Sequence, residues 1–309
     1  MKKEKTWTWP IGSYLFLGGL GGGMMAISAV ADLFFDMGNA FALGTLAAAI
    51  IIGIGSGLLV FDLGRPFYFW RVFSREKAIL TVGAWVLTLA IVCGLIYGSL
   101  LLVFSPWHSF EGLRLVFAWI CLLLGVGVAI YTGIFLGTIK ARPFWNSPAL
   151  PILFLISAVS TGLAGQSLLI HFWALGATES QVTTIASFLH LSDIGLLVLE
   201  IIVLMVYVLI MRYSTTVPSA QIATSWVSGS KKLQFWGGLV FLGLILPIVF
   251  YLVPGSVTYL LAAALVLVGG IILRFLVVYT DDRVLLPGEE QFLFWLPSGD
   301  EEFLHAWEE

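Results

Sequence analysis

Residues 78–104 read AILTVGAWVLTLAIVCGLIYGSLLLVF, a run that contains no charged side chain. About 20 apolar residues in a helix cross the roughly 30 Å hydrocarbon core of a bilayer, so a run of this length predicts a transmembrane helix. Membrane-spanning β-strands are shorter and alternate in polarity, which this stretch does not. The segment therefore predicts an integral membrane protein built from α-helices.

Similar apolar runs recur along the sequence. Of its residues, 60% are hydrophobic and 11% are charged, whereas soluble proteins carry roughly 25% charged residues. The runs predict about eight transmembrane helices, at 11–35, 40–61, 78–104, 112–139, 149–175, 188–211, 233–253 and 257–279. We expect an all-α protein with an N-terminal segment (1–10), a first four-helix bundle (11–139), a second (140–279) and an acidic, aromatic tail (280–309).

The first predicted helix is rich in glycine, with Gly18, Gly19 and the run Gly21–Gly23. Small residues at such spacings let helix backbones approach closely in lipid. The pattern fits tight helix packing or a groove for a ligand.

The charged residues predict the topology. Eight spans place both termini on one side of the membrane, here called the terminal side. The opposite loops hold no lysine or arginine, so the positive-inside rule favours cytoplasmic termini, although loops that dock an acidic partner would show the same bias. No basic surface for nucleic acid is evident. The terminal-side basic residues are Lys2, Lys3, Lys5, Arg65, Arg71, Arg75, Lys77, Lys140, Arg142, Arg212, Lys231, Lys232 and Arg283.

Cysteine and histidine usage limits the cofactors that the protein could hold. Cys93 and Cys121 both lie in apolar runs, and two thiolates are too few for an iron–sulfur cluster, which needs four ligands. Only His171 and His190 lie at matching depth for a haem, and both are near one surface. The cysteines and histidines do not cluster in the sequence as the ligands of a zinc site do. We expect no metal, haem or cluster in this protein.

Several polar residues fall inside the predicted spans, where charge is costly and usually functional. Glu200 and Arg274 could form a pair that reduces the cost of burying both, as a structural pin or as part of a proton route. Asp32 could serve a function or lie in the wet interface. A polar ladder could lead toward Glu200 through Gln166, His171, His190 and Asp193. Alternatively, the two histidines and the aspartate of this ladder lie in the wet interface.

Two terminal-side loops combine arginine, proline and aromatic residues. Residues 62–71 read DLGRPFYFWR, and residues 140–148 read KARPFWNSP, shortly after Tyr131-Thr-Gly133. Prolines fix turns, arginines reach acidic groups, and aromatic side chains line sites for flat, apolar ligands. Anchoring at the membrane interface would explain the tryptophans and arginines, but not two similar Arg-Pro loops on one side.

These motifs resemble the NrfD/PsrC family, the membrane subunits of polysulfide-reductase-like and related respiratory complexes. The resemblance covers about residues 9–279. It rests on WPIGSYLFLGGLGGG at 9–23, the 62–71 loop, Tyr131-Thr-Gly133 with RPFWN at 142–146, and SAVSTGLAG at 157–165.

The resemblance implies a quinone, expected to be menaquinone, as the only cofactor. A four-cluster, ferredoxin-like iron–sulfur protein would dock on the membrane face and carry electrons between the quinone and a catalytic subunit, often a molybdopterin enzyme. Tyr131 matches the tyrosine whose hydroxyl can hydrogen-bond a quinone carbonyl and assist proton transfer. Further candidates for the quinone site are Asp62, Arg65, Trp9 and Tyr14. Candidates for partner docking are Arg71, Arg75, Arg142 and Trp145.

The resulting expectation is a subunit of a respiratory oxidoreductase in a prokaryotic inner membrane, of the kind used in anaerobic respiration. It would carry out a quinol dehydrogenase or quinone reductase half-reaction and anchor the catalytic subunit. Candidates for its proton route are Glu200, Arg274, Asp193, His171 and Gln166. The best-known members place catalysis outside the cytoplasm, opposite to the side that the basic residues favour here. The alternatives are a proton-coupled transporter, although no inverted repeat is evident, and an anchor without quinone chemistry.

Overall fold

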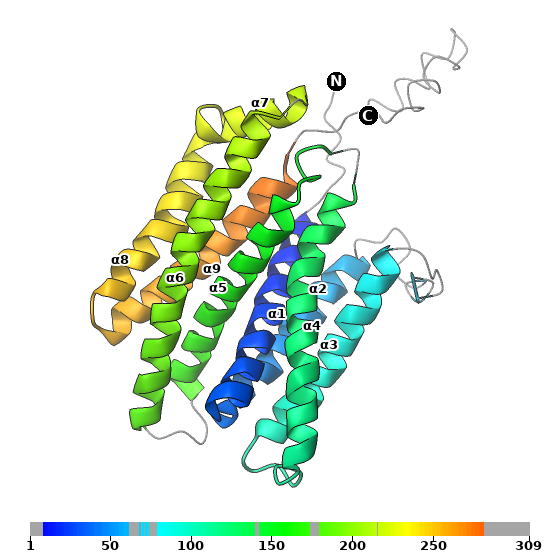
Figure 1. Cartoon of the computed structure of the whole chain (residues 1–309), viewed down its shortest axis with the longest axis vertical. Coiled ribbons are helices and arrows are strands. Elements are labelled where there is room, and N and C mark those ends of the chain that lie inside the picture. The colour runs from blue at the N-terminus through cyan, green and yellow to red at the C-terminus, as the bar shows by residue number, and fades with distance from the viewer. Residues whose placement is uncertain are drawn as a thin grey trace.

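The structure is a computed structural model that describes residues 9–61, 68, 70, 72–73, 79–139, 142–173, 179–214 and 216–280. The helices within these ranges pack side by side (Figure 1). Their bounds are α1 Trp9–Phe35, the 3₁₀ turn η1 Gly38–Phe41, α2 Ala42–Phe61, α3 Ile79–Leu101, α4 Glu111–Gly137, α5 Ala149–Trp173, α6 Glu179–Arg212, α7 Val217–Val227, the π-helix η3 Leu233–Ile245, α8 Leu246–Leu252 and α9 Ser256–Val278.

The described residues contain eight helices that are long and apolar enough to cross a membrane. They correspond to the eight predicted spans, with η1 extending α2 and with η3 and α8 forming one span. The prediction of an all-α integral membrane protein is therefore confirmed. α6 begins at Glu179 rather than at residue 188, because its first turns are too polar to extend an apolar run.

α7 was not predicted from the sequence. Its eleven residues are too few to span a bilayer, and it links α6 to η3 on the terminal side. A proline lies in its first turn, where the missing N–H costs no hydrogen bond. Its buried residues are Ser219, Ile222, Ala223 and Trp226, so one face packs on the bundle as in an amphipathic helix.

α1 and α5 form the centre of the molecule. In their most apolar windows, 83% and 72% of the residues are buried, whereas the other spans reach at most 56%. α1 packs against α2, α4, α5 and α9. A Cβ on Gly22 would lie 2.7 Å from the backbone oxygen of Gly125, and one on Gly23 would lie 2.0 Å from that of Ala158. The glycines of α1 thus serve tight helix packing.

The remaining spans flank this centre. α2, α3 and α4 lie on one side, and α6, η3–α8 and α9 on the other (Figure 1). α1 and α5 also pack closely on each other, so the described residues form one continuous body. The division into two four-helix bundles stays a prediction. The start of α1 and the end of α9 lie at the same end of the bundle.

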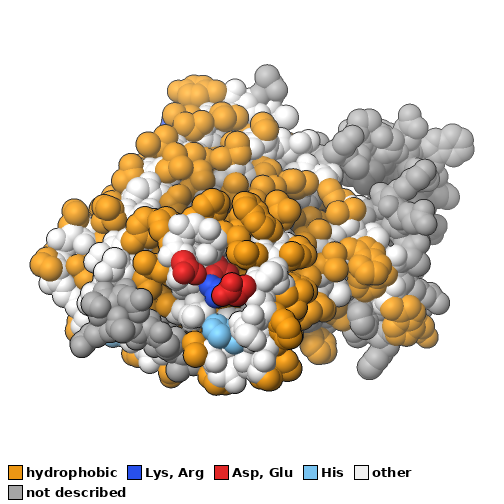
Figure 2. All heavy atoms as spheres, turned by 60° about the horizontal axis from the view of Figure 1, so that its bottom comes forward, with side chains coloured by type: hydrophobic (Ala, Val, Ile, Leu, Met, Phe, Trp, Pro, Cys, Tyr) orange, Lys and Arg blue, Asp and Glu red, His pale blue; other side chains and the backbone are white. Residues whose placement is uncertain are grey.

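At the opposite end, charged side chains form a small cluster within an apolar surface (Figure 2). Asp32 is buried and accepts hydrogen bonds from the Arg114 Nε at 3.0 Å and from the Tyr97 hydroxyl at 2.8 Å. Asp36 is exposed, 3.6 Å from the same guanidinium. Asp32 is therefore an ion-paired residue that joins α1 to α3 and α4.

Candidate functional site

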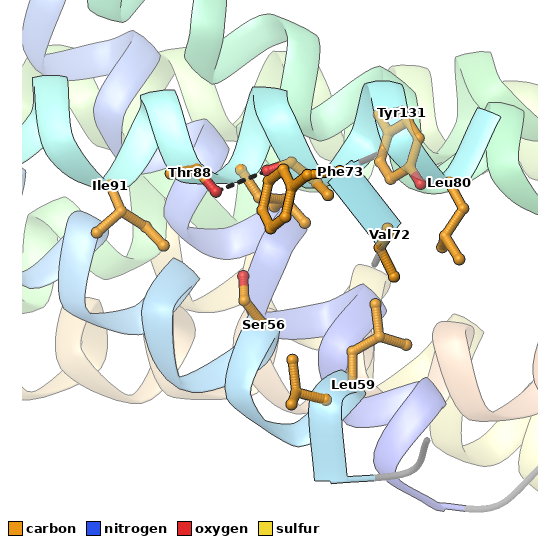
Figure 3. Close-up of a pocket in the computed structure, with 11 residues that line it drawn as sticks. Ser56, Leu59, Val72, Phe73, Leu80, Thr88, Ile91 and Tyr131 are labelled. Carbon is orange, nitrogen blue, oxygen red and sulfur yellow. Dashed lines mark hydrogen bonds between the residues drawn. The ribbon is translucent and has the colours of Figure 1, made fainter. Parts of the chain in front are cut away.

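A cavity of about 170 Å³ lies between α2, α3 and α4 in the terminal-side half of the bundle (Figure 3). Its lining includes the exposed Thr88, and most of its other side chains are partly exposed. The cavity therefore reaches the outer, lipid-facing surface between α2 and α3. The lining residues are Ser56, Leu59, Val60, Val72, Phe73, Leu80, Ala84, Leu87, Thr88, Ile91 and Tyr131.

The Tyr131 side chain of α4 lies against Gly83 of α3 and lines this cavity. Its side chain is 8% exposed. A Cβ added to Gly83 would lie 1.9 Å from Cζ and 2.0 Å from the hydroxyl oxygen of Tyr131. The phenol ring thus occupies the space that the side chain of any residue other than glycine at position 83 would fill. Gly83 could not be predicted, because nothing in a single sequence says which glycine faces Tyr131.

The cavity lining is apolar apart from three hydroxyls, those of Ser56, Thr88 and Tyr131. The Ser56 hydroxyl donates to the backbone oxygen of Ile52, and the Thr88 hydroxyl donates to that of Ala84, both at 2.8 Å. Figure 3 places the three side chains around the cavity. Such a site suits a flat, largely apolar ligand with a few polar atoms.

A segment before α3 covers one end of the cavity. The Thr81 hydroxyl donates a 2.6 Å hydrogen bond to the backbone oxygen of Val72. The rings of Phe73 and Trp85 meet edge to face, with centroids 5.1 Å apart. These contacts hold Val72 and Phe73 against α3, where both line the cavity.

A second polar group lies between α5, α6, α8 and α9. His190 and Ser167 are hydrogen-bonded at 2.9 Å, and the His190 ring stacks on Tyr251 with centroids 5.1 Å apart. The hydroxyls of Tyr251 and Ser160 donate to the two carboxyl oxygens of Asp193, at 2.9 and 2.6 Å. His190 and Asp193 are three residues apart, so both lie on one face of α6.

The same faces of α5 and α6 continue inward to Glu200. Glu200 is 3% exposed and hydrogen-bonds to Ser157. Arg274 is fully buried and donates to the Ser157 hydroxyl and to the backbone oxygens of Phe154 and Gly270. It also attracts Glu200 electrostatically. Glu200 and Arg274 thus share Ser157 as a hydrogen-bonding partner and attract each other, whereas a direct ion pair between them stays a prediction.

A second cavity, of about 480 Å³, lies at the end of this polar group away from the termini. Ser167, His171, His190 and Tyr259 contribute to its lining. We use "polar column" for His190, Ser167, Tyr251, Asp193, Ser160, Ser157, Glu200 and Arg274 together. The column runs from this cavity into the interior of the bundle.

Comparison with known proteins identifies the family. The sequence profile described as "Polysulphide reductase, NrfD" matches residues 1–284. The protein belongs to the NrfD family. It is 31% identical to the C subunit of the polysulfide reductase of Wolinella succinogenes, over 88% of this sequence and 93% of that protein. It is 27% identical to protein NrfD of Escherichia coli, over 88% and 94% of the two sequences.

Of the other predicted quinone ligands in this NrfD-family protein, the structure describes Tyr14 and Trp9. Tyr14 interacts electrostatically with Tyr131. Tyr14 is 1% exposed on α1, and its hydroxyl has no hydrogen-bond partner among the described residues. Trp9 is 59% exposed at the start of α1. Neither lines the cavity. Asp62 and Arg65 lie outside the described residues, as do Arg71 and Arg75.

Arg142 and Trp145, two predicted docking residues, are buried. The Arg142 guanidinium lies 4.5 Å from the centre of the Trp145 ring and donates a 2.6 Å hydrogen bond to the backbone oxygen of Thr280. The Trp145 Nε1 donates at 2.8 Å to the backbone oxygen of Val277. Both residues tie the loop before α5 to the end of α9, and a docking role for them stays a prediction.

The two remaining predicted members of the proton route differ in position. His171 is exposed at the rim of the second cavity. Gln166 is buried and donates to the backbone oxygen of Met24 and to the Ser28 hydroxyl, at 2.8 and 2.6 Å. It therefore faces α1 and not the polar column. Tyr251, Ser160 and Ser167 were not among the predicted members of the route, because hydroxyl residues are common in apolar helices and only the packing shows which of them face Asp193 and His190.

Proposed function

We propose that this protein is the quinone-reactive membrane subunit of a respiratory oxidoreductase complex. The head group enters from the lipid between α2 and α3 and lies in the first cavity beside the Tyr131 hydroxyl. The observation that carries this proposal is a single phenol, seated on Gly83, in an apolar cavity that reaches the lipid-facing surface. The relative named as the C subunit of polysulfide reductase supports assembly into a multi-subunit complex.

Electrons must leave or reach this site through a partner. Oxidation of a quinol releases two electrons and two protons, and the two cysteines of this protein cannot hold an iron–sulfur cluster. We assign the electron transfer to a ferredoxin-like iron–sulfur subunit on the terminal side, the end of the bundle nearer to the cavity. A catalytic subunit, expected to carry molybdopterin, would complete the complex.

The same proposal includes a membrane, a substrate and an orientation for the protein. We place the protein in a prokaryotic inner membrane, with menaquinone as the expected substrate. The concentration of basic residues on the terminal side supports cytoplasmic termini. Docking of an acidic partner on these residues is the competing explanation of the bias.

We further propose that the polar column exchanges protons with the side opposite the termini. The second cavity lets water reach His190, with His171 at its rim. From there, hydroxyls and carboxyls follow one another to Glu200 and Arg274. Gln166 is left out of this route because both of its hydrogen bonds point to α1.

Replacing Tyr131 with Phe tests the quinone site. The change removes one hydroxyl and keeps the ring, so the complex should assemble normally. Loss of one hydrogen bond to the head group should lower quinone turnover about tenfold. Turnover is measured with the purified complex and a short-chain naphthoquinol. The control is Tyr213→Phe, which removes a hydroxyl at an 80% exposed position. Equal turnover of the two variants would support the alternative of an anchor without quinone chemistry.

A further inference from the structure

We propose that Ser56 and Thr88 make the first cavity selective for the reduced, hydroquinone form of its substrate. The inference rests on the proposed quinone site and adds to it the redox form that the site prefers. The two residues lie on facing helices, α2 and α3, and both line the cavity (Figure 3).

The proton of each hydroxyl is already engaged. Ser56 donates to the Ile52 oxygen and Thr88 to the Ala84 oxygen, four residues earlier in each helix. A serine or threonine hydroxyl has one donor and two acceptor lone pairs. With the donor directed to the backbone, each oxygen can only accept a hydrogen bond from a ligand. Lipid supplies no alternative partner for this proton.

The two redox forms of a quinone differ in the groups that they offer. The carbonyls of the oxidised form only accept hydrogen bonds, whereas the hydroxyls of the reduced form also donate them. A hydroquinone O–H can therefore bond to Ser56 or Thr88 as these side chains stand. An oxidised carbonyl can do so only if the side chain gives up its bond to the helix.

Tyr131 does not discriminate in this way. No hydrogen bond from its hydroxyl to the described residues is found, and a phenol both donates and accepts. It can serve either form, at one end of the head group. The preference for the reduced form must then arise from Ser56 and Thr88, the other two hydroxyls among the described lining residues.

The test uses the double variant Ser56→Ala, Thr88→Val in the intact complex, reconstituted in lipid. The dissociation constant of a short-chain naphthohydroquinone is measured with the dithionite-reduced complex, because the reduced complex cannot oxidise this ligand. The dissociation constant of the matching naphthoquinone is measured with the oxidised complex. We expect hydroquinone binding to weaken about tenfold, the worth of roughly one hydrogen bond, and quinone binding to stay unchanged. The matched control is Thr45→Val. Thr45 makes the same kind of bond, to the Phe41 oxygen at 3.0 Å, and does not line the cavity.

A second readout is the midpoint potential of the bound quinone. If the wild type binds the reduced form tenfold more tightly, the double variant should lower this two-electron potential by about 30 mV. Equal weakening of both forms, or no change in either, would overturn the selectivity and leave the quinone site standing. Failure of the wild-type complex to bind either form would overturn the site and this inference together.

Discussion

Gly83→Ala is expected to lower quinone turnover about 100-fold, because a displacement of roughly 1 Å in a reacting group can cost that much. The new Cβ would fall 1.9 Å from Cζ of Tyr131, so the ring must swing away. Alanine is about 1 kcal/mol more favourable than glycine in a helix, so α3 itself should not be weakened. Turnover and thermal stability of the purified complex are measured together.

Two further variants locate the cause of this loss. Gly57→Ala on α2 is the matched control, since a Cβ there meets nothing within 4 Å, and it should leave turnover unchanged. The double variant Gly83→Ala, Tyr131→Phe should lose far less than the product of the two single losses, because both changes act on the same hydroxyl. Wild-type turnover in Gly83→Ala would show that the phenol's position does not matter to the reaction.

Arg274→Met is expected to destabilise the protein by about 3–5 kcal/mol, because it leaves Glu200 buried without its charged partner. The double variant Arg274→Met, Glu200→Leu removes both charges and should recover most of this loss. Thermal unfolding in mild detergent measures both effects. If the single variant were as stable as the wild type, the pair would not hold the bundle together.

The stable double variant also separates the two roles considered for this pair. If Glu200 and Arg274 act only as a structural pin, the double variant should recover proton-coupled quinone turnover along with stability. If they carry protons, it should be stable while proton uptake in sealed vesicles falls. The proposed route requires the second result, and the first would contradict it.

The fold could be predicted from the sequence because each span is a long apolar run. The uncharged run at 78–104 and the glycine-rich stretch of α1 can be recognised directly in the sequence. α7 could not be predicted in the same way, because its eleven residues form no apolar run long enough for a span. The ion pair of Asp32 with Arg114 joins residues far apart in the sequence, which no local pattern reveals.

The candidate site was predictable only in part. The family resemblance indicated Tyr131, and the charged residues within spans indicated Glu200 and Arg274. Gly83, Ser56 and Thr88 have ordinary residue types for membrane helices, and only the packing of α2, α3 and α4 brings them together. In the same way, Arg142 was predicted to be a docking residue from its loop, whereas its hydrogen bond to the Thr280 oxygen depends on where α9 ends.

The most direct test of the quinone site is photolabelling of the native complex in its membrane with a light-activated naphthoquinone analogue, followed by peptide mapping. We expect labels on Ser56–Val60 of α2 and Leu80–Ile91 of α3, which disappear when excess naphthoquinone competes. Competable labels found only around the second cavity, on residues such as Thr183 and Tyr259, would contradict it.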